Sequence, residues 1–376
     1  MEILADGQDM CFQEKVIRMN NQALATKYRP RSFSEVCSQE SITTILEHQI
    51  QTNTFKQAYI FTGPAGCGKT TCARILANEI NKGQGNPIEL DAASNNSVDN
   101  IRDISNQARM QSLDSEYKVY ILDECHMLSS GAWAAMLKLI EEPPAKTIFI
   151  LATTDIQKVP KTILSRCQRF DFHKIPLDVI VDRLTEIVIR ENSQDYDDPD
   201  LRDIGDIVHH QEALEYIAKI ADGGMRDAIT LLDKCLDYSY DLTVENVVEA
   251  LGVVDYDVMF NLTRAIFDDG DVYGVSEMVR IIEKLYADGK DLKQFIKHYM
   301  SFILDLCKYQ VCGDFKLVQI PSIFEDAMKR FGYTPLVALL NVVVQLNSEI
   351  KWESNPKALI ESTLMIYAVS IGENDG

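Results

Sequence analysis

Residues 59–71, YIFTGPAGCGKTT, decide how the rest of this chain folds. An apolar run ends at Gly63, and residues 70–80 then carry apolar side chains at helical spacing. A strand, a glycine-rich loop and a helix in this order fit the G-x-x-x-x-G-K-[ST] pattern, whose backbone N–H groups surround phosphate oxygens. The stretch therefore predicts a phosphate-binding loop rather than an ordinary glycine turn.

The side chains of this loop have distinct expected roles. Lys69 would reach the β- and γ-phosphates of a nucleoside triphosphate as a positive point charge. The Thr70 hydroxyl would be a ligand of Mg²⁺. We expect the whole loop to bind the nucleotide, through Gly63, Pro64, Ala65, Gly66, Cys67, Gly68, Lys69, Thr70 and Thr71.

A second half of the triphosphate site is predicted at the end of the apolar strand 118–122, KVYIL. Asp123 and Glu124 follow it directly. Asp123 would hold Mg²⁺ and Glu124 would orient and polarise the attacking water, because phosphoryl transfer needs charge neutralisation and positioning more than covalent help. The alternative, a solvated pair of loop carboxylates, is disfavoured by the phosphate loop upstream.

Further apolar strands at 88–91, 147–152 and 168–172 alternate with helical segments. This alternation predicts a doubly wound parallel sheet with the nucleotide at the carboxyl edge of its strands. From residue 177 the pattern is entirely helical. We therefore expect four parts: a loose extension over 1–19, an ATPase domain over 20–176, a helical lid over 177–251 and a helical oligomerisation domain over 252–376.

Composition narrows the class of protein. The net charge of −20 disfavours a nucleic-acid partner, yet residues 20–178 hold 17 Lys/Arg and 17 Asp/Glu, so this half is neutral and can carry a local basic strip. Nine cysteines without a C-x-x-C pair predict reduced thiols and no zinc site. Since no signal peptide or long apolar segment is found, we expect a cytoplasmic protein that does not contact membranes.

Taken together, seven ordered motifs within residues 23–251 resemble the AAA+ clamp-loader ATPases, in particular those of bacterial DNA polymerase III. They are KYRPRSF from Lys27, GPAGCGKTT from Gly63, ELDAASNN from Glu89, VYILDECHML from Val119, LKLIEEPP from Leu137, ILATTDIQKVPKTILSRCQRFDF from Ile150 and ADGGMRDAITLLDK from Ala221.

The resemblance implies an α/β AAA+ P-loop NTPase domain with a parallel five-stranded sheet, followed by an all-α lid and an all-α collar. It also implies an ATP-driven motor subunit that opens a sliding clamp and loads it onto primed DNA, with ATP and Mg²⁺ as cofactors. Its partners would be delta-type and delta-prime-type subunits in a heteropentamer, the clamp, and primer–template DNA bound through its backbone.

The resemblance also assigns residues around the nucleotide. Thr154, with Thr153 beside it, would be the first sensor near the γ-phosphate. Arg226, in the GGMRD turn, would be a second sensor that reaches the phosphates from the lid. The adenine and phosphate side of the pocket would be lined by Tyr28, Arg29, Pro30 and Val36.

Other arginines are assigned roles between subunits or toward DNA. Arg166, in the SRC motif, would be an arginine finger that enters the neighbouring subunit's site, so that hydrolysis depends on assembly. Arg102, and more weakly Arg109, would contact the DNA backbone without reading sequence. The alternative for Arg102 is a solvated helix charge paired with Asp99 or Asp103.

Three departures from the family pattern stand out. The segment 81–86, NKGQGN, replaces the four-cysteine zinc module that family members usually carry. The chain ends near the expected close of the collar, as in a short form, and Ser38 alters a turn beside the pocket. Two rivals remain: a subunit that lends its finger without hydrolysing ATP, and another AAA+ machine, such as a Holliday-junction motor or an archaeal-type loader small subunit.

Overall fold

A computed structural model describes residues 22–110, 114–192, 207–251, 256–267, 272–321 and 324–372. These residues fall into two compact units, Met1–Asp241 and Leu242–Gly376, each of which has its own internal contacts. The predicted extension over 1–19 lies outside the described residues.

The first unit contains a sheet of five parallel strands in the order β2-β3-β4-β1-β5. This confirms the predicted parallel sheet. β1 and β4 are buried along their whole length, because helices cover both faces and leave each strand no solvated side. The strands are β1 (Ala58–Thr62), β2 (Ile88–Asp91), β3 (Lys118–Asp123), β4 (Thr147–Thr153) and β5 (Gln168–Asp171).

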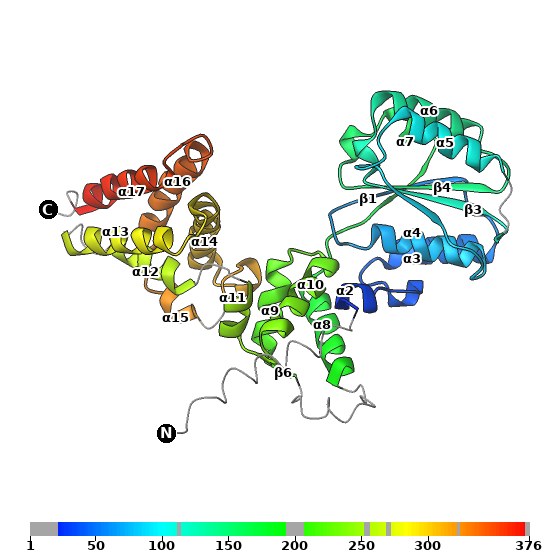
Figure 1. The fold of residues 1–376 in the computed structure, drawn as a ribbon. Coiled ribbons are helices and arrows are strands. Elements are labelled where there is room, and N and C mark those ends of the chain that lie inside the picture. Colours follow the sequence, from blue (N-terminus) through cyan, green and yellow to red (C-terminus); the bar gives the residue numbers. More distant parts are fainter. Residues whose placement is uncertain are drawn as a thin grey trace, which may run out of the picture. The chain divides into compact units, whose positions relative to one another are not determined.

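Each face of the sheet is covered by its own set of helices (Figure 1). One apolar cluster joins the sheet to α3 and α4, and a second joins it to α5, α6 and α7. α5 begins after Ser97, whose hydroxyl accepts the Asn100 N–H at the first turn. The helices are α3 (Glu40–Gln51), α4 (Lys69–Ile80), α5 (Val98–Ala108), α6 (Ser130–Glu141) and α7 (Lys161–Leu164).

The rest of the first unit is a small helical bundle that follows the sheet. Its amphipathic helices bury one face each, and the short N-terminal helix α2 (Leu24–Lys27) joins them through a hydrogen bond from Leu24 N–H to Asp233 Oδ2 of 3.2 Å. The bundle consists of α8 (Leu177–Asn192), α9 (Gln211–Ile220) and α10 (Met225–Tyr238), with the short strands β6 (Val208–His209) and β7 (Asp241–Leu242).

Beyond Leu242, the last residue of β7, the regular structure of the second unit is helical in its described residues. The division between the units falls before α11, whereas the predicted lid, 177–251, includes this helix. The four predicted domain ranges stay predictions. No described helix combines the length and the low charge needed to span a bilayer. The helices are α11 (Val244–Leu251), α12 (Tyr256–Phe267), α13 (Val272–Ala287), α14 (Leu292–Cys312), α15 (Glu325–Met328), α16 (Tyr333–Glu349) and α17 (Pro356–Gly372).

Candidate functional site

The predicted phosphate loop runs from the end of β1 to the start of α4 and depends on left-handed glycines. Gly66 and Gly68 have φ of +70° and +103°, values that residues with a Cβ rarely adopt. A Cβ on Gly63 would lie 2.3 Å from the carbonyl oxygen of Phe172. The glycines therefore let the loop turn tightly between the sheet and the helix.

Lys69 is held inside this loop by its own backbone. The side chain is 6% exposed, and its Nζ donates to the carbonyl oxygens of Gly63 at 2.9 Å and Pro64 at 2.6 Å. A buried ammonium requires such acceptors. They fix the charge at the mouth of the loop, beside the backbone N–H groups of α4's first turn.

Thr70 and Asp123 meet although they lie on different elements. The Thr70 hydroxyl donates to Asp123 Oδ2 at 2.8 Å, because α4 begins and β3 ends at the carboxyl edge of the sheet. A hydroxyl and a carboxylate are hard oxygen donors of the kind that Mg²⁺ prefers. The pair therefore fits the predicted magnesium ligands.

Glu124 is held by contacts from two directions. Its Oε2 accepts the Thr154 hydroxyl at 2.9 Å and the Thr154 N–H at 3.3 Å, and His126 Nδ1 lies 3.2 Å away. Glu124 itself has a left-handed backbone, with φ of +46°. Thr153 is fully buried and its hydroxyl accepts the Asp155 N–H, so of the two threonines only Thr154 contacts this carboxylate.

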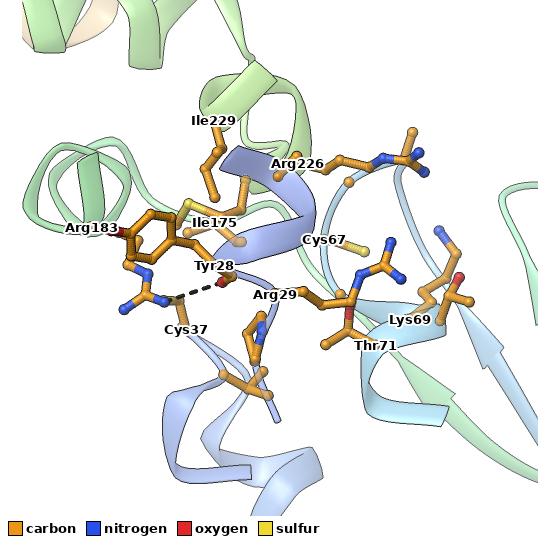
Figure 2. A pocket seen from close by; sticks show the side chains of 18 of the residues that line it. Tyr28, Arg29, Cys37, Cys67, Lys69, Thr71, Ile175, Arg183, Arg226 and Ile229 are labelled. Atoms are coloured by element: carbon orange, nitrogen blue, oxygen red, sulfur yellow. Dashed lines mark hydrogen bonds between the residues drawn. The ribbon is translucent and has the colours of Figure 1, made fainter. Parts of the chain in front are cut away.

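These groups line a cavity of about 200 Å³ (Figure 2). Tyr28, Ile175, Arg183 and Ile229 gather at one end of it, and Arg29 and Lys69 lie at the other. Three other predicted residues, Gly63, Pro64 and Thr154, do not line the cavity, although Thr154 contacts Glu124, which does. The predicted residues that do are Tyr28, Arg29, Pro30, Val36, Ala65, Gly66, Cys67, Gly68, Lys69, Thr70, Thr71, Asp123, Glu124 and Arg226.

Six further lining residues were not predicted. Two of them adjoin predicted residues, so a wider reading of the motifs would have included them. Ile175 and Arg183 follow the last strand, where no motif marks a ligand site. The six are Ala25, Cys37, Ile175, Arg183, Met225 and Ile229.

The helical bundle closes over the phosphate loop through its backbone. A Cβ on Gly66 would lie 2.9 Å from the Cα of Gly224, just before α10. The Ile175 N–H donates to the Gly223 carbonyl at 3.1 Å. This close approach brings Arg226, two residues into α10, to the same cavity as Lys69.

Burial and neighbouring charge alter the ionisation of several lining residues. Burial lowers the pKa of the Arg29 guanidinium, and the like charges of Arg74 and Arg226 lower it further. Burial raises the pKa of the Cys37 and Cys67 thiols. Both thiols are therefore neutral, and the positive charge of the cavity comes from its arginines and Lys69.

Three predicted site residues lie away from this cavity. Arg166 is 40% exposed and pairs with Glu141 at 2.9 Å. Arg102 is exposed and pairs with Asp99 at 3.1 Å, as a solvated helix charge does, and Arg109 is exposed at the end of α5. Across the described ranges no group of His, Cys, Asp and Glu is arranged to hold a metal ion by itself.

Comparison with known proteins identifies relatives along most of the chain. Residues 88–176 match a family model described as DNA polymerase III, delta subunit, and residues 203–241 match the DNA polymerase III clamp loader subunit, ATPase lid domain. DNA polymerase III subunit tau of Bacillus subtilis is 36% identical over 91% of this chain and 62% of its own length. Subunit gamma/tau of Mycobacterium tuberculosis is 30% identical over 90% of this chain and 61% of its own.

The chain thus spans about three-fifths of the length of these relatives. Among solved structures, the RuvB Holliday junction branch migration motor of Thermotoga maritima is similar, with a TM-score of 0.48 and 20% identity over 70% of this chain and 86% of that one.

Proposed function

Because this chain belongs to the gamma/tau family of DNA polymerase III clamp-loader subunits, we propose that it is the ATP-hydrolysing motor subunit of a clamp loader. It binds ATP in the cavity between the sheet and the helical bundle. It uses hydrolysis to open a sliding clamp and load it onto primed DNA. On the same family relation we propose delta-type and delta-prime-type partners in a heteropentamer, and a cytoplasmic location.

One observation carries the proposal: a single cavity is lined by the phosphate loop, both carboxylates and Arg226 of the helical bundle. Phosphoryl transfer requires positioned positive charge around the phosphates and an oriented water, and these groups provide both. Lys69 and the loop N–H groups bind the phosphates. Glu124, whose Oε2 is held by Thr154, orients the attacking water.

Thr70 and Asp123 would hold Mg²⁺, which neutralises phosphate charge when bound. Arg226 would bind the phosphates from the helical bundle, which corresponds to the predicted lid. The angle between the bundle and the sheet would then change with the nucleotide bound. Tyr28, Arg29, Pro30 and Val36 would bind the nucleotide from the N-terminal segment.

Arg166 is proposed as a finger that acts on a neighbouring subunit. Its exposure and its pair with Glu141, which is itself 41% exposed, support this role, since an exposed ion pair is weak and readily exchanged for a stronger partner. The exposed pair of Arg102 with Asp99 is similarly available to DNA phosphates, as is Arg109.

A subunit that lends a finger without hydrolysing ATP is the second candidate. The match of residues 88–176 to a family model of the delta subunit favours it. The presence of Lys69, Thr70, Asp123 and Glu124 in one site favours the motor instead, because a subunit without hydrolysis does not need them.

Steady-state ATP hydrolysis separates the two candidates. The chain is assayed alone, and then with delta-type and delta-prime-type subunits, sliding clamp and primed DNA. We expect low activity alone, a sharp rise in the full mixture, and a loss of roughly 10³-fold or more for Arg166→Ala in that mixture. Arg169→Ala, which removes another half-exposed arginine paired with Asp171, is the control and retains activity. Hydrolysis that ignores the clamp and DNA would contradict the loader function.

A further inference from the structure

A second cavity, with a volume of about 490 Å³, adjoins the nucleotide cavity and shares some of its lining residues. It is formed by the segment that follows α2 and by α8 of the helical bundle. No predicted function accounts for it. Its lining residues are Lys27, Tyr28, Arg29, Arg31, Glu35, Arg183 and Arg190.

The cavity is strongly basic in a chain whose net charge is −20. Five of its seven lining residues are Lys or Arg, and Glu35 is the one carboxylate among them. Converging arginines are costly to hold together unless an anion compensates them. This concentration of charge therefore points to an anionic ligand.

Some of these cations are compensated from behind the cavity. Lys27 pairs with Glu191 at 2.8 Å, and Arg183 pairs with Glu186 at 2.6 Å. Glu186 also pairs with Arg190. The three side chains are thereby held in position along the wall of the cavity.

Two other cations of the cavity have no such compensation. Within the described part of the chain, no carboxylate forms an ion pair with the guanidinium of Arg29 or Arg31. The Glu35 carboxylate accepts the backbone N–H of Arg31, at 2.8 Å, rather than a guanidinium. The charges around Arg29 that lower its pKa are those of Arg74 and Arg226, and Glu89 opposes them with a smaller effect. The Arg31 guanidinium is therefore available to a ligand of this cavity, and Arg29 is shared with the nucleotide cavity.

The two cavities share a wall. Tyr28, Arg29 and Arg183 line both of them, and the Arg183 guanidinium donates to the Tyr28 carbonyl at 3.3 Å (Figure 2). An occupant of the second cavity would therefore contact residues that also contact the nucleotide.

We propose that this second cavity binds a phosphate-bearing anion, and that its occupancy is coupled to nucleotide binding through Arg29 and Arg183. Several phosphate groups fit better than one carboxylate, because the planar guanidinium binds phosphate oxygens in pairs and the cavity has room for more than one group. The phosphates come either from a free oligophosphate or from a nucleic-acid backbone. Anion binding here does not require ATP hydrolysis, whereas its coupling to the nucleotide rests on the proposed function.

Calorimetric titration with inorganic tripolyphosphate tests the site. The chain is first saturated with a non-hydrolysable ATP analogue, in excess Mg²⁺, so that the phosphate loop is filled. We expect one tripolyphosphate site on the native chain. In the double variant Arg31→Gln/Arg190→Gln the affinity for tripolyphosphate should fall by about tenfold or more, since two charged contacts are lost. Neither of these arginines lines the nucleotide cavity.

Arg264→Gln/Arg280→Gln is the matched control, because it removes the same charge from exposed positions of the second unit. It should bind tripolyphosphate like the native chain. If both variants bind tripolyphosphate equally weakly, the attraction is non-specific and the proposed site is wrong. If Arg31→Gln/Arg190→Gln is folded, as thermal unfolding shows, and still binds tripolyphosphate with native affinity, the proposed site is also wrong. The absence of any binding to the saturated native chain would also overturn it.

A second titration identifies the source of the phosphates. The native chain and the Arg31→Gln/Arg190→Gln variant are titrated with a fluorescent single-stranded oligonucleotide. If the native chain binds it, tripolyphosphate displaces it and the variant does not bind it, the phosphates come from nucleic acid. Tripolyphosphate binding that the oligonucleotide leaves unchanged assigns it to a free oligophosphate. Coupling is measured as the change in affinity for the ATP analogue when tripolyphosphate is added, and we expect this change in the native chain and not in the variant. Since hydrolysis is not measured, failure here leaves the motor function untouched.

Discussion

At the scale of single residues, the contact between Thr154 and Glu124 determines how the carboxylate can act. The Thr154 hydroxyl lies 2.9 Å from Glu124 Oε2, whereas the backbone N–H lies 3.3 Å away. The hydroxyl is therefore the stronger of the two donors. We interpret Thr154 as a positioning residue for the proposed general base.

Glu124→Gln should lower the rate of ATP hydrolysis by roughly 10² to 10⁴, because the amide orients water without accepting its proton. Thr154→Val should lower kcat about tenfold with KM unchanged, since only the position of the carboxylate is lost. Nucleotide binding, measured with a fluorescent analogue, should survive both changes.

Thr52→Val is the control for the loss of a threonine hydroxyl, because Thr52 is exposed at the end of α3 and away from the cavity. It should hydrolyse ATP at the native rate. A Thr154→Val variant with native kcat would show that Glu124 does not need this contact.

At the scale of elements, the phosphate loop and α10 approach each other through glycine backbones. A methyl group on Gly66 would lie 2.9 Å from the Cα of Gly224, and backbone atoms cannot swing away as a side chain can. The loop and the helical bundle must separate to admit it. Nucleotide binding should suffer, because Arg226 enters the cavity from this side.

Gly66→Ala should therefore weaken nucleotide binding about tenfold or more, in addition to a loss of about 1 kcal/mol in unfolding free energy from its left-handed backbone. Gly289→Ala is the matched control: its φ of +71° is nearly the same, but no atom lies within 4 Å of the added methyl group. It should show the loss of stability alone. Calorimetry and thermal unfolding measure the two quantities, and native nucleotide affinity in Gly66→Ala would refute the contact's role.

At the scale of the whole molecule, assembly is expected to involve the C-terminal helices. α17 exposes Met365, Ile366 and Val369 at 37%, 71% and 44%, and their spacing places them on one face of the helix. An exposed apolar face of this kind is typical of a protein interface. It fits the predicted role of residues 252–376 in oligomerisation.

Ile366→Asp should weaken association with the other loader subunits, because a carboxylate would be buried in an apolar interface. The unfolding free energy of the chain alone should change by about 0.5 kcal/mol or less, since this side chain is already largely exposed. Light scattering of the mixed subunits measures the association. Tyr273→Asp, at a position 83% exposed on α13, is the control, and equal weakening by both would argue against an interface specific to α17.

The sequence by itself determined the phosphate loop, the five strands and the carboxylates at the end of β3. Each of these is a local pattern: glycines at fixed offsets, apolar runs of strand length, and acidic residues directly after such a run. The order of strands and helices then placed Lys69, Thr70 and Asp123 at one sheet edge, because parallel strands present their carboxyl ends together.

The tertiary structure alone decided the rest of the site. Ile175, between β5 and α8, and Arg183, in α8, reach the nucleotide cavity, and Thr154 bonds to Glu124 across 30 residues of chain. The basic cavity likewise combines the segment after α2 with α8. Contacts of this kind produce no recognisable motif in the sequence. The distance between two side chains in a folded chain depends on how their elements pack and not on how many residues separate them.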